Sequence, residues 1–231
     1  RITPATTEEN ILDVVTLTGF HDPACVLHEP FAQWVIEDTF VDDARPAWDL
    51  VGAELVQDVA PFEAMKLRCL NGSHSTLAYL GYLAGYETIA QTVADRRFSL
   101  LLDRLWQEEV VATVTAPQGV DVSAYCADLK RRFENPSIAH KTWQIAMDGS
   151  QKLPQRLLGT LGDNLAAGRS IEWVTLAVAA WMRYVGGVDE AGQAIDVRDP
   201  MADDLCARFE AGADVAAKVN NLLSCRDIFS Q

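Results

Sequence analysis

Three polar side chains interrupt an apolar helical pattern that runs from residue 61 to residue 91. They are Lys66, Asn71 and His74, a lysine followed five residues later by an asparagine and three residues after that by a histidine. With about 100° of rotation per helical residue, Asn71 lies roughly 140° and His74 roughly 80° from Lys66 around the axis. We therefore expect one broad helix face to present all three side chains to a single small ligand.

This combination of groups can oxidise a secondary alcohol without a metal ion. A neutral Lys66 amine would remove the hydroxyl proton as a hydride leaves the adjacent carbon. Asn71 and His74 would donate hydrogen bonds to the oxygen while negative charge develops on it, in the manner of an oxyanion hole. The three residues are therefore a candidate catalytic group.

The neighbours of Lys66 act on its charge in opposite directions. Burial among apolar side chains such as Met65 and Leu70, together with the positive charge of Arg68, favours the neutral amine that a base requires. Glu63 lies one helical turn earlier and favours the ammonium form, so we expect it either to pair with Lys66 or to relay its proton to solvent. By itself, the spacing also fits a solvated lysine, a capping asparagine and a half-buried histidine.

Apolar residues recur at helical spacing through most of the chain, so we expect a mainly α fold. Residues that favour helix starts precede several of these segments, at Thr7, Pro61, Asp121 and Pro154. Residues 33–40 fit either a strand or a helix, and residues 189–200 predict a short surface hairpin. Because no internal repeat or linker-like tract appears, we interpret residues 1–231 as one compact domain.

The 231 residues include 33 acidic and 19 basic ones, for a net charge of -14. This negative field opposes phosphate backbones and anionic lipid surfaces, so we expect neither a nucleic-acid nor a membrane partner. The five cysteines form no CxxC pair, which favours reduced thiols in a cytoplasmic protein over a disulfide framework. The longest largely apolar run, residues 174–181, is too short to span a membrane, and the first residues contain no signal-peptide core.

We expect no metal ligand and no cofactor-binding residue in this chain. The acidic clusters at residues 121–128 and 199–204 lack the spacing of a calcium loop. His21, Cys25 and His28 lie close together, but no fourth ligand follows at a suitable spacing. Neither GxGxxG nor GxxxxGK[ST] occurs, so the sequence predicts no nucleotide-binding unit.

The twenty residues that start at Lys66, KLRCLNGSHSTLAYLGYLAG, resemble the signature helix of the polyol-specific long-chain dehydrogenases, a family that includes mannitol dehydrogenase and fructuronate reductase. The resemblance covers almost the whole chain, through EPFAQWVIEDTF, VGAELVQDVAPFEAMKLR, RFENPSIAHKTWQIAMDGSQKLPQR and WMRYVGGVDEAG. It implies that Lys66, Asn71 and His74 occupy the positions of the family's catalytic lysine, asparagine and histidine.

In this family a Rossmann-type domain precedes a mostly helical substrate-binding domain, and the first residues, RITPATTEEN, resemble the junction between the two. The resemblance therefore implies a multi-helical C-terminal domain of a two-domain dehydrogenase, whose partner is the Rossmann domain of the same protein. NAD(H) would be bound mainly by that other domain, which is absent from this chain. We expect the chain alone to be inactive, and the resemblance leaves the oligomeric state open.

Four further residues are candidates for substrate binding. Lys152, in DGSQKLPQR, resembles the family's second lysine near the substrate, where it would bind a distal hydroxyl or carboxylate. Arg156 and Arg183 would add positive charge for a uronate carboxylate, and His140 would line the same cleft. Each also has a plain structural interpretation, as an exposed loop lysine, a helix-surface arginine or a capping histidine.

The resemblance favours one substrate class and leaves two alternatives. The sequence of residues 142–156 favours a substrate class in which a keto sugar acid and its hydroxy acid are interconverted, such as fructuronate and mannonate. Mannitol and fructose, which lack the carboxylate, are the first alternative. A non-catalytic helical interaction module is the second, since a domain without a nucleotide site could serve as a binding piece.

Overall fold

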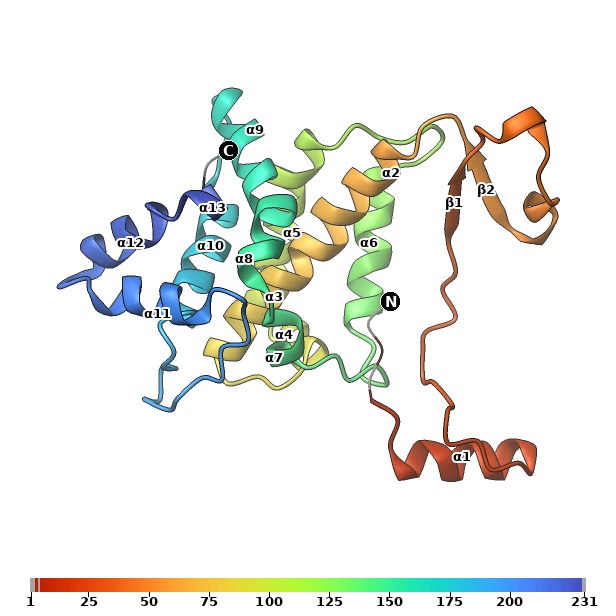
Figure 1. Cartoon of the computed structure of the whole chain (residues 1–231), viewed down its shortest axis with the longest axis horizontal. Coiled ribbons are helices and arrows are strands. Elements are labelled where there is room, and N and C mark those ends of the chain that lie inside the picture. Colours follow the sequence, from red (N-terminus) through yellow and green to blue (C-terminus); the bar gives the residue numbers. More distant parts are fainter. Residues whose placement is uncertain (1–2, 4, 230–231) are drawn as a thin grey trace.

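The computed structural model describes residue 3 and residues 5–229, which form a helical body and an extended N-terminal arm (Figure 1). The α-helices are α1 (Glu8–Thr18), α2 (Ala60–Met65), α3 (Gly72–Leu83), α4 (Ile89–Ala94), α5 (Arg96–Arg104), α6 (Val122–Phe133), α7 (Thr142–Ala146), α8 (Gly149–Leu153), α9 (Gly159–Ala166), α10 (Glu172–Tyr184), α11 (Ala202–Glu210), α12 (Val215–Leu223) and α13 (Arg226–Phe229). Wider π turns are η3 (Lys66–Asn71), η4 (Leu105–Val110) and η6 (Pro154–Leu158), and short 3-10 turns are η1 (Val41–Asp43), η2 (Trp48–Val51) and η5 (Val111–Thr113). The strands are β1 (Trp34–Glu37) and β2 (Ala53–Val56). The expected mainly α fold is confirmed.

Helix α3 runs through the middle of the body and packs against α10 and α7 (Figure 1). Trp181, Tyr79 and Tyr184 are among the largest fully buried side chains. The rings of Tyr79 and Tyr184 lie 5.5 Å apart between their centroids, where α3 meets α10. This packing fixes α3, which carries part of the candidate catalytic group.

Most predicted helix starts are confirmed, and one is wrong. Thr7 caps α1 in a capping box, the Asp121 carboxylate caps α6, and Pro61 lies in the first turn of α2. Pro154, however, does not begin a helix, because α8 precedes it and η6 and α9 follow without a break. A proline inside a helix lacks an N–H and crowds the preceding turn, and the wider π turn η6, which begins at Pro154, accommodates both effects.

Residues 60–83 form one continuous helical stretch from α2 through η3 to α3. Within η3 the Cys69 carbonyl accepts hydrogen bonds from Ser73 Oγ at 2.6 Å and Trp106 Nε1 at 3.2 Å. These two donors satisfy a buried backbone acceptor where the regular helical ladder changes register. The helical stretch is therefore fixed both by the hydrogen bond from Trp106 on η4 and by the packing of α3 against α7 and α10.

The arm, residues 5–57, extends away from the body and carries α1 and a two-stranded parallel sheet (Figure 1). The ambiguous segment of residues 33–40 thus contains a strand, β1. The predicted hairpin appears as an antiparallel bridge between Val188 and Ala194, closed by the Asp189 N–H, which donates to the Gln193 carbonyl at 2.9 Å. Within the described residues, no helix is long and apolar enough to cross a membrane.

Candidate active site

A cavity of about 460 Å³ lies beside η3 and the first turn of α3. Lys66, Asn71 and His74 line it, so the three side chains that the sequence placed on one helix face reach one space. His140, from the loop before α7, and Arg156, from η6, line the same cavity. The fold thus brings Lys66 together with Arg156, which lies 90 positions further along the chain.

The π turn changes how the first two residues of this group are related. At its end the Gly72 N–H donates to the carbonyl of Leu67, five residues earlier, where an α-helix would use the fourth. The regular rotation assumed from the sequence therefore does not apply between Lys66 and Asn71. π turns of this kind occur frequently at functional sites.

His74 packs among aromatic rings that restrict its ionisation. Its ring centroid lies 4.6 Å from that of Phe133 and 5.6 Å from that of His140, with the two imidazoles perpendicular. Burial lowers the pKa of His74 to about 3, and the nearby charges of His140, Arg156 and Arg132 contribute to the shift. A neutral imidazole at pH 7 donates a hydrogen bond from one ring nitrogen and accepts one at the other.

Two polar atoms of this group have no partner within the described part of the chain. Asn71 Oδ1 and His74 Nε2 are both buried, and neither makes a hydrogen bond. Because buried polar atoms are nearly always hydrogen-bonded, each such atom calls for a specific explanation. An oxygen-rich ligand in the cavity would supply one, since a hydroxyl can both donate and accept.

Arg156 is held over the site by an unusually close approach of two helical segments. A Cβ atom added to Gly72 would lie 2.7 Å from the Arg156 carbonyl oxygen, so only glycine lets η6 come this near. Arg156 Nη1 donates to Ser75 Oγ at 3.2 Å. Burial lowers the pKa of Arg156, yet a guanidinium stays protonated in proteins at pH 7. The cavity therefore contains a fixed positive charge.

Lys66 is exposed in this chain, so the burial expected from its apolar neighbours is not present. Arg68 does not act on it as expected either, because its guanidinium bonds to Asp163 at 2.5 Å and to the Thr113 carbonyl at 2.7 Å. Glu63 is exposed on α2 and does not line the cavity. The apolar residues around Lys66 pack into the body, while Lys66 itself is exposed where it lines the cavity.

Several cavity residues were not identified from the sequence. Glu29, Phe31 and Gln33 come from the arm, and Tyr125 and Arg132 come from α6. Arg132 forms two hydrogen bonds to Glu29, at 2.8 and 2.6 Å, and its guanidinium lies 4.1 Å from the Phe31 ring centroid. The only signal was that these residues, Tyr125 excepted, lie in segments that resemble the dehydrogenase family. No motif joined them, because 103 residues separate the two halves of the ion pair.

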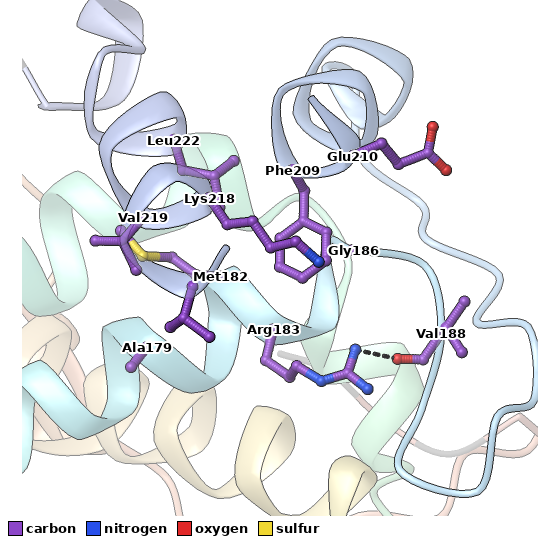
Figure 2. Close-up of a pocket in the computed structure, with 11 residues that line it drawn as sticks. Ala179, Met182, Arg183, Gly186, Val188, Phe209, Glu210, Lys218, Val219 and Leu222 are labelled. Atoms are coloured by element: carbon purple, nitrogen blue, oxygen red, sulfur yellow. Dashed lines mark hydrogen bonds between the residues drawn. The ribbon is translucent and has the colours of Figure 1, made fainter. Parts of the chain in front are cut away.

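Two of the predicted substrate-binding residues lie elsewhere. Figure 2 shows Arg183 on α10 pointing to the Val188 carbonyl, beside a separate cavity between α10, α11 and α12. Its Nε also pairs with Glu190 at 3.0 Å. Lys152 does not line the cavity beside η3, and its amine donates to the Met147 carbonyl at 2.5 Å. In this structure both residues make contacts that stabilise neighbouring loops.

The described residues contain no group of three or more His, Cys, Asp or Glu side chains arranged to hold a metal ion. The polar groups that line the cavity are amine, amide, imidazole, guanidinium, phenol and carboxylate groups.

Known proteins resemble this chain in both sequence and structure. Residues 58–231 match the family described as the mannitol dehydrogenase C-terminal domain. D-mannonate oxidoreductase of Escherichia coli (strain K12) is 52% identical over 230 residues, which cover 100% of this chain and 47% of that protein. Mannitol dehydrogenase 2 of Saccharomyces cerevisiae is 39% identical over 232 residues, covering 100% of the chain and 45% of the relative.

A solved structure has the same fold. The mannitol 2-dehydrogenase of Pseudomonas fluorescens, in a ternary complex with NAD and D-mannitol, superposes with a TM-score of 0.89 at 38% sequence identity. The match covers 99% of this chain and 46% of that protein, so the chain spans about half the length of its relatives. Together with the match over residues 58–231, these similarities establish that the chain belongs to the mannitol dehydrogenase C-terminal domain family.

Proposed function

We propose that this chain is the substrate-binding and catalytic half of an NAD-dependent oxidoreductase that interconverts a keto sugar acid and its hydroxy acid. The observation that carries the proposal is the cavity in which Lys66, Asn71 and His74 meet, with two buried polar atoms left without partners. The 52% identity to a D-mannonate oxidoreductase supports the substrate class. The five cysteines are all free, which supports a cytoplasmic location.

In the proposed mechanism each of the three residues has a separate role. Lys66, as the neutral amine, takes the proton of the substrate hydroxyl during oxidation and returns it to the carbonyl oxygen during reduction. Asn71, through its side-chain N–H groups, and neutral His74 donate hydrogen bonds to that oxygen while it carries negative charge, and the unpartnered Asn71 Oδ1 would accept from a neighbouring substrate hydroxyl. NAD(H), which the other half of the protein would hold, would provide the hydride acceptor for oxidation and the hydride donor for reduction. Glu63, one helical turn before Lys66, would relay the proton onwards to solvent.

The charge around the cavity supports an acidic substrate. Glu29 and Arg132 neutralise one another, whereas no carboxylate among the described lining residues pairs with Arg156. A carboxylate at one end of a sugar would complement Arg156 in a partly buried position, where such a pair is stronger than in water. This local positive charge lies in a chain whose net charge is -14.

A neutral polyol is the second candidate substrate, because the solved relative binds D-mannitol. Replacement of Arg156 by Gln in the intact enzyme separates the two candidates. We expect KM for the sugar acid to rise about tenfold, the cost of a charge-assisted hydrogen bond, with little change for mannitol. Arg104→Gln, at an exposed site on α5, is the matched control. An equal rise in KM for the sugar acid and for mannitol would mean that Arg156 does not recognise a carboxylate.

Replacement of Lys66 by Ala in the intact enzyme tests the function itself. Turnover should fall by roughly 10² to 10⁴, because proton transfer loses its base. Affinity for NADH should stay unchanged, since the cofactor is expected to lie in the other half.

The remaining alternative, a non-catalytic helical module, predicts a different outcome. In that case Lys66→Ala, Asn71→Ala and His74→Ala would leave any activity of the intact protein unaffected. Under the proposed mechanism, Asn71 and His74 variants lose roughly 10² to 10³ in turnover at every pH, because the developing oxyanion loses a donor.

A further inference from the structure

The turn that joins α7 to α8 has a backbone conformation that needs support from other segments. Asp148, the residue before α8, has a φ angle of 55°, in the left-handed region that residues other than glycine rarely adopt. The next residue has no room for a side chain, because a Cβ atom on Gly149 would lie 2.7 Å from the hydroxyl oxygen of Tyr79. A conformation of this kind persists only where surrounding contacts hold it.

The loop before α11 supplies such contacts through residues 196–199, which we call the strap. The Arg198 carbonyl accepts a hydrogen bond from the Asp148 N–H at 2.9 Å. The Asp199 carboxylate accepts two more, from the Ser150 N–H at 2.8 Å and from Ser150 Oγ at 2.6 Å. The first N–H groups of a helix have no acceptor within the helix, so Asp199 supplies one to the first turn of α8.

The strap is itself held by contacts on both of its sides. Trp143 Nε1, on α7, donates to the Asp196 carbonyl at 2.8 Å, and the Arg198 guanidinium lies 4.5 Å from the centroid of the Trp143 ring. On the other side, the Met201 N–H donates to Asp199 Oδ1 at 2.9 Å. These contacts fix the Asp199 carboxylate, so its position determines where α8 begins.

The helical stretch that begins at this turn ends at the cavity beside η3. Because η6 follows α8 without a break, Ser150 and Arg156 belong to one helical stretch. At its far end Arg156 Nη1 donates to Ser75 Oγ at 3.2 Å, and the Arg156 carbonyl lies against Gly72. A hydrogen-bonded helix transmits a displacement along its length, so a shift at Ser150 would move the Arg156 guanidinium in the cavity.

We propose that Asp199 is a positioning residue, which sets the place of Arg156 in the cavity through the first turn of α8. The proposal rests on the proposed function, in which Arg156 binds the carboxylate of the substrate. Asp199 is not among the described residues that line the cavity. Its effect on substrate binding should therefore depend on the presence of Arg156.

Kinetics of the intact protein test this dependence with Asp199→Asn, alone and combined with Arg156→Gln. The carboxamide turns an NH₂ group towards one of the donors, so a hydrogen bond at the start of α8 is lost. KM for the sugar acid should rise about fivefold, less than for Arg156→Gln, with kcat and KM for mannitol unchanged. In the Arg156→Gln background the same change should have no further effect. An equal rise in both backgrounds would overturn the proposal.

Hydrogen exchange in the intact protein, followed by mass spectrometry, tests the positioning without any assay of activity. In Asp199→Asn the amides of residues 149–158 should exchange at least about tenfold faster than in the parent. Unchanged exchange, or a change confined to residues 149–153, would overturn the proposal, because the shift would not reach Arg156. Lys66→Ala tests the proposed function separately. If its turnover is unchanged the function fails, while the exchange rates still decide whether Asp199 holds the stretch.

Two further variants complete the test. Ser150→Ala removes one donor and keeps the carboxylate, so KM for the sugar acid should rise about twofold, again only while Arg156 is present. Asp203→Asn, at an exposed site in the first turn of α11, is the matched control and should leave KM and exchange unchanged. A rise in KM as large as that of Asp199→Asn would mean that negative charge in this region, and not the hydrogen bonds to Ser150, affects the substrate. The proposal would then be wrong.

Discussion

The imidazole of His74 illustrates how neighbouring residues set the chemistry of one group. Phe133 packs against one side of the ring, and His140 meets it edge-on. Two cations, Arg156 and Arg132, oppose a further positive charge. The result is a hydrogen-bond donor that stays neutral, which suits an oxygen that gains negative charge without needing a second proton.

We predict that His74 stays neutral from pH 8 down to about pH 4, because its pKa is lowered to about 3. Its imidazole proton signals in NMR spectra should not shift over that range, and His74→Asn identifies which signals belong to it. The unfolded chain has the ordinary histidine pKa, about 6.5, and so binds an extra proton between pH 6.5 and 3. The free energy of unfolding should therefore fall as pH falls through this window, by about 2 kcal/mol at pH 5. Titration of His74 near pH 6.5 would show that the ring is open to water.

Residue types and spacing predicted part of this site. Lys66, Asn71 and His74 stand close together in the sequence, so one helical pattern could relate them. Glu29 and Arg132 could not be related in that way, because their ion pair depends on how the arm folds back on α6. Arg183 was predicted to bind substrate and lies at another cavity, since the residue type alone does not say which way a helix faces.

At the scale of elements, the body depends on polar contacts that join one helix to the end of another. α10 has no side-chain cap of its own at Ile171. Instead the buried carboxylate of Glu109, on η4, accepts hydrogen bonds from the N–H groups of Trp173 at 2.9 Å and Val174 at 2.8 Å. A negative charge at a helix N-terminus is favourable, so Glu109 fixes where α10 begins and how it packs on η4.

Replacement of Glu109 by Gln should lower the free energy of unfolding by about 2 to 3 kcal/mol. The substitution removes the negative charge. The new side-chain NH₂ group would face the backbone N–H groups of Trp173 and Val174, which are also donors, so at least one buried N–H group would lose its acceptor. Urea unfolding of the isolated chain measures the loss. Glu172→Gln, an exposed carboxylate in the first turn of α10, should change stability by less than about 0.5 kcal/mol. An equal loss of unfolding free energy in both variants would mean that negative charge in general, and not the buried hydrogen bonds of Glu109, stabilises the N-terminus of α10.

The irregular elements were harder to predict than the helices themselves. Capping residues such as Thr7 and Asp121 act on adjacent backbone groups, so a short sequence is enough to identify them. The π turns η3, η4 and η6 depend on partners from distant segments, such as Trp106 bonding to the Cys69 carbonyl. For the same reason Pro154 was taken as a helix start, when the fold uses it inside a longer helical stretch.

At the scale of the whole molecule, the groups proposed for proton transfer lie in this chain, whose sequence contains no glycine-rich dinucleotide motif. We predict that the isolated chain neither binds NADH at micromolar concentration nor oxidises polyols, because it has no glycine-rich loop at a helix N-terminus to hold phosphates. Isothermal titration calorimetry with NADH checks this directly. Saturable micromolar binding would place part of the cofactor site in this half.

The contact between Glu29 and Arg132 also limits where two related proteins can be joined to make a chimeric enzyme. Residue 58, where the family match begins, looks like a natural crossover point. A crossover there would import Phe31 and Glu29 from another parent and set them against the native α6. A crossover before α1 would keep Glu29 and Arg132 from the same parent, so the ion pair at the cavity would stay native. The junction between the two parents would then lie outside the cavity. Libraries that recombine first halves to change cofactor preference should therefore keep residues 5–57 with the helical body.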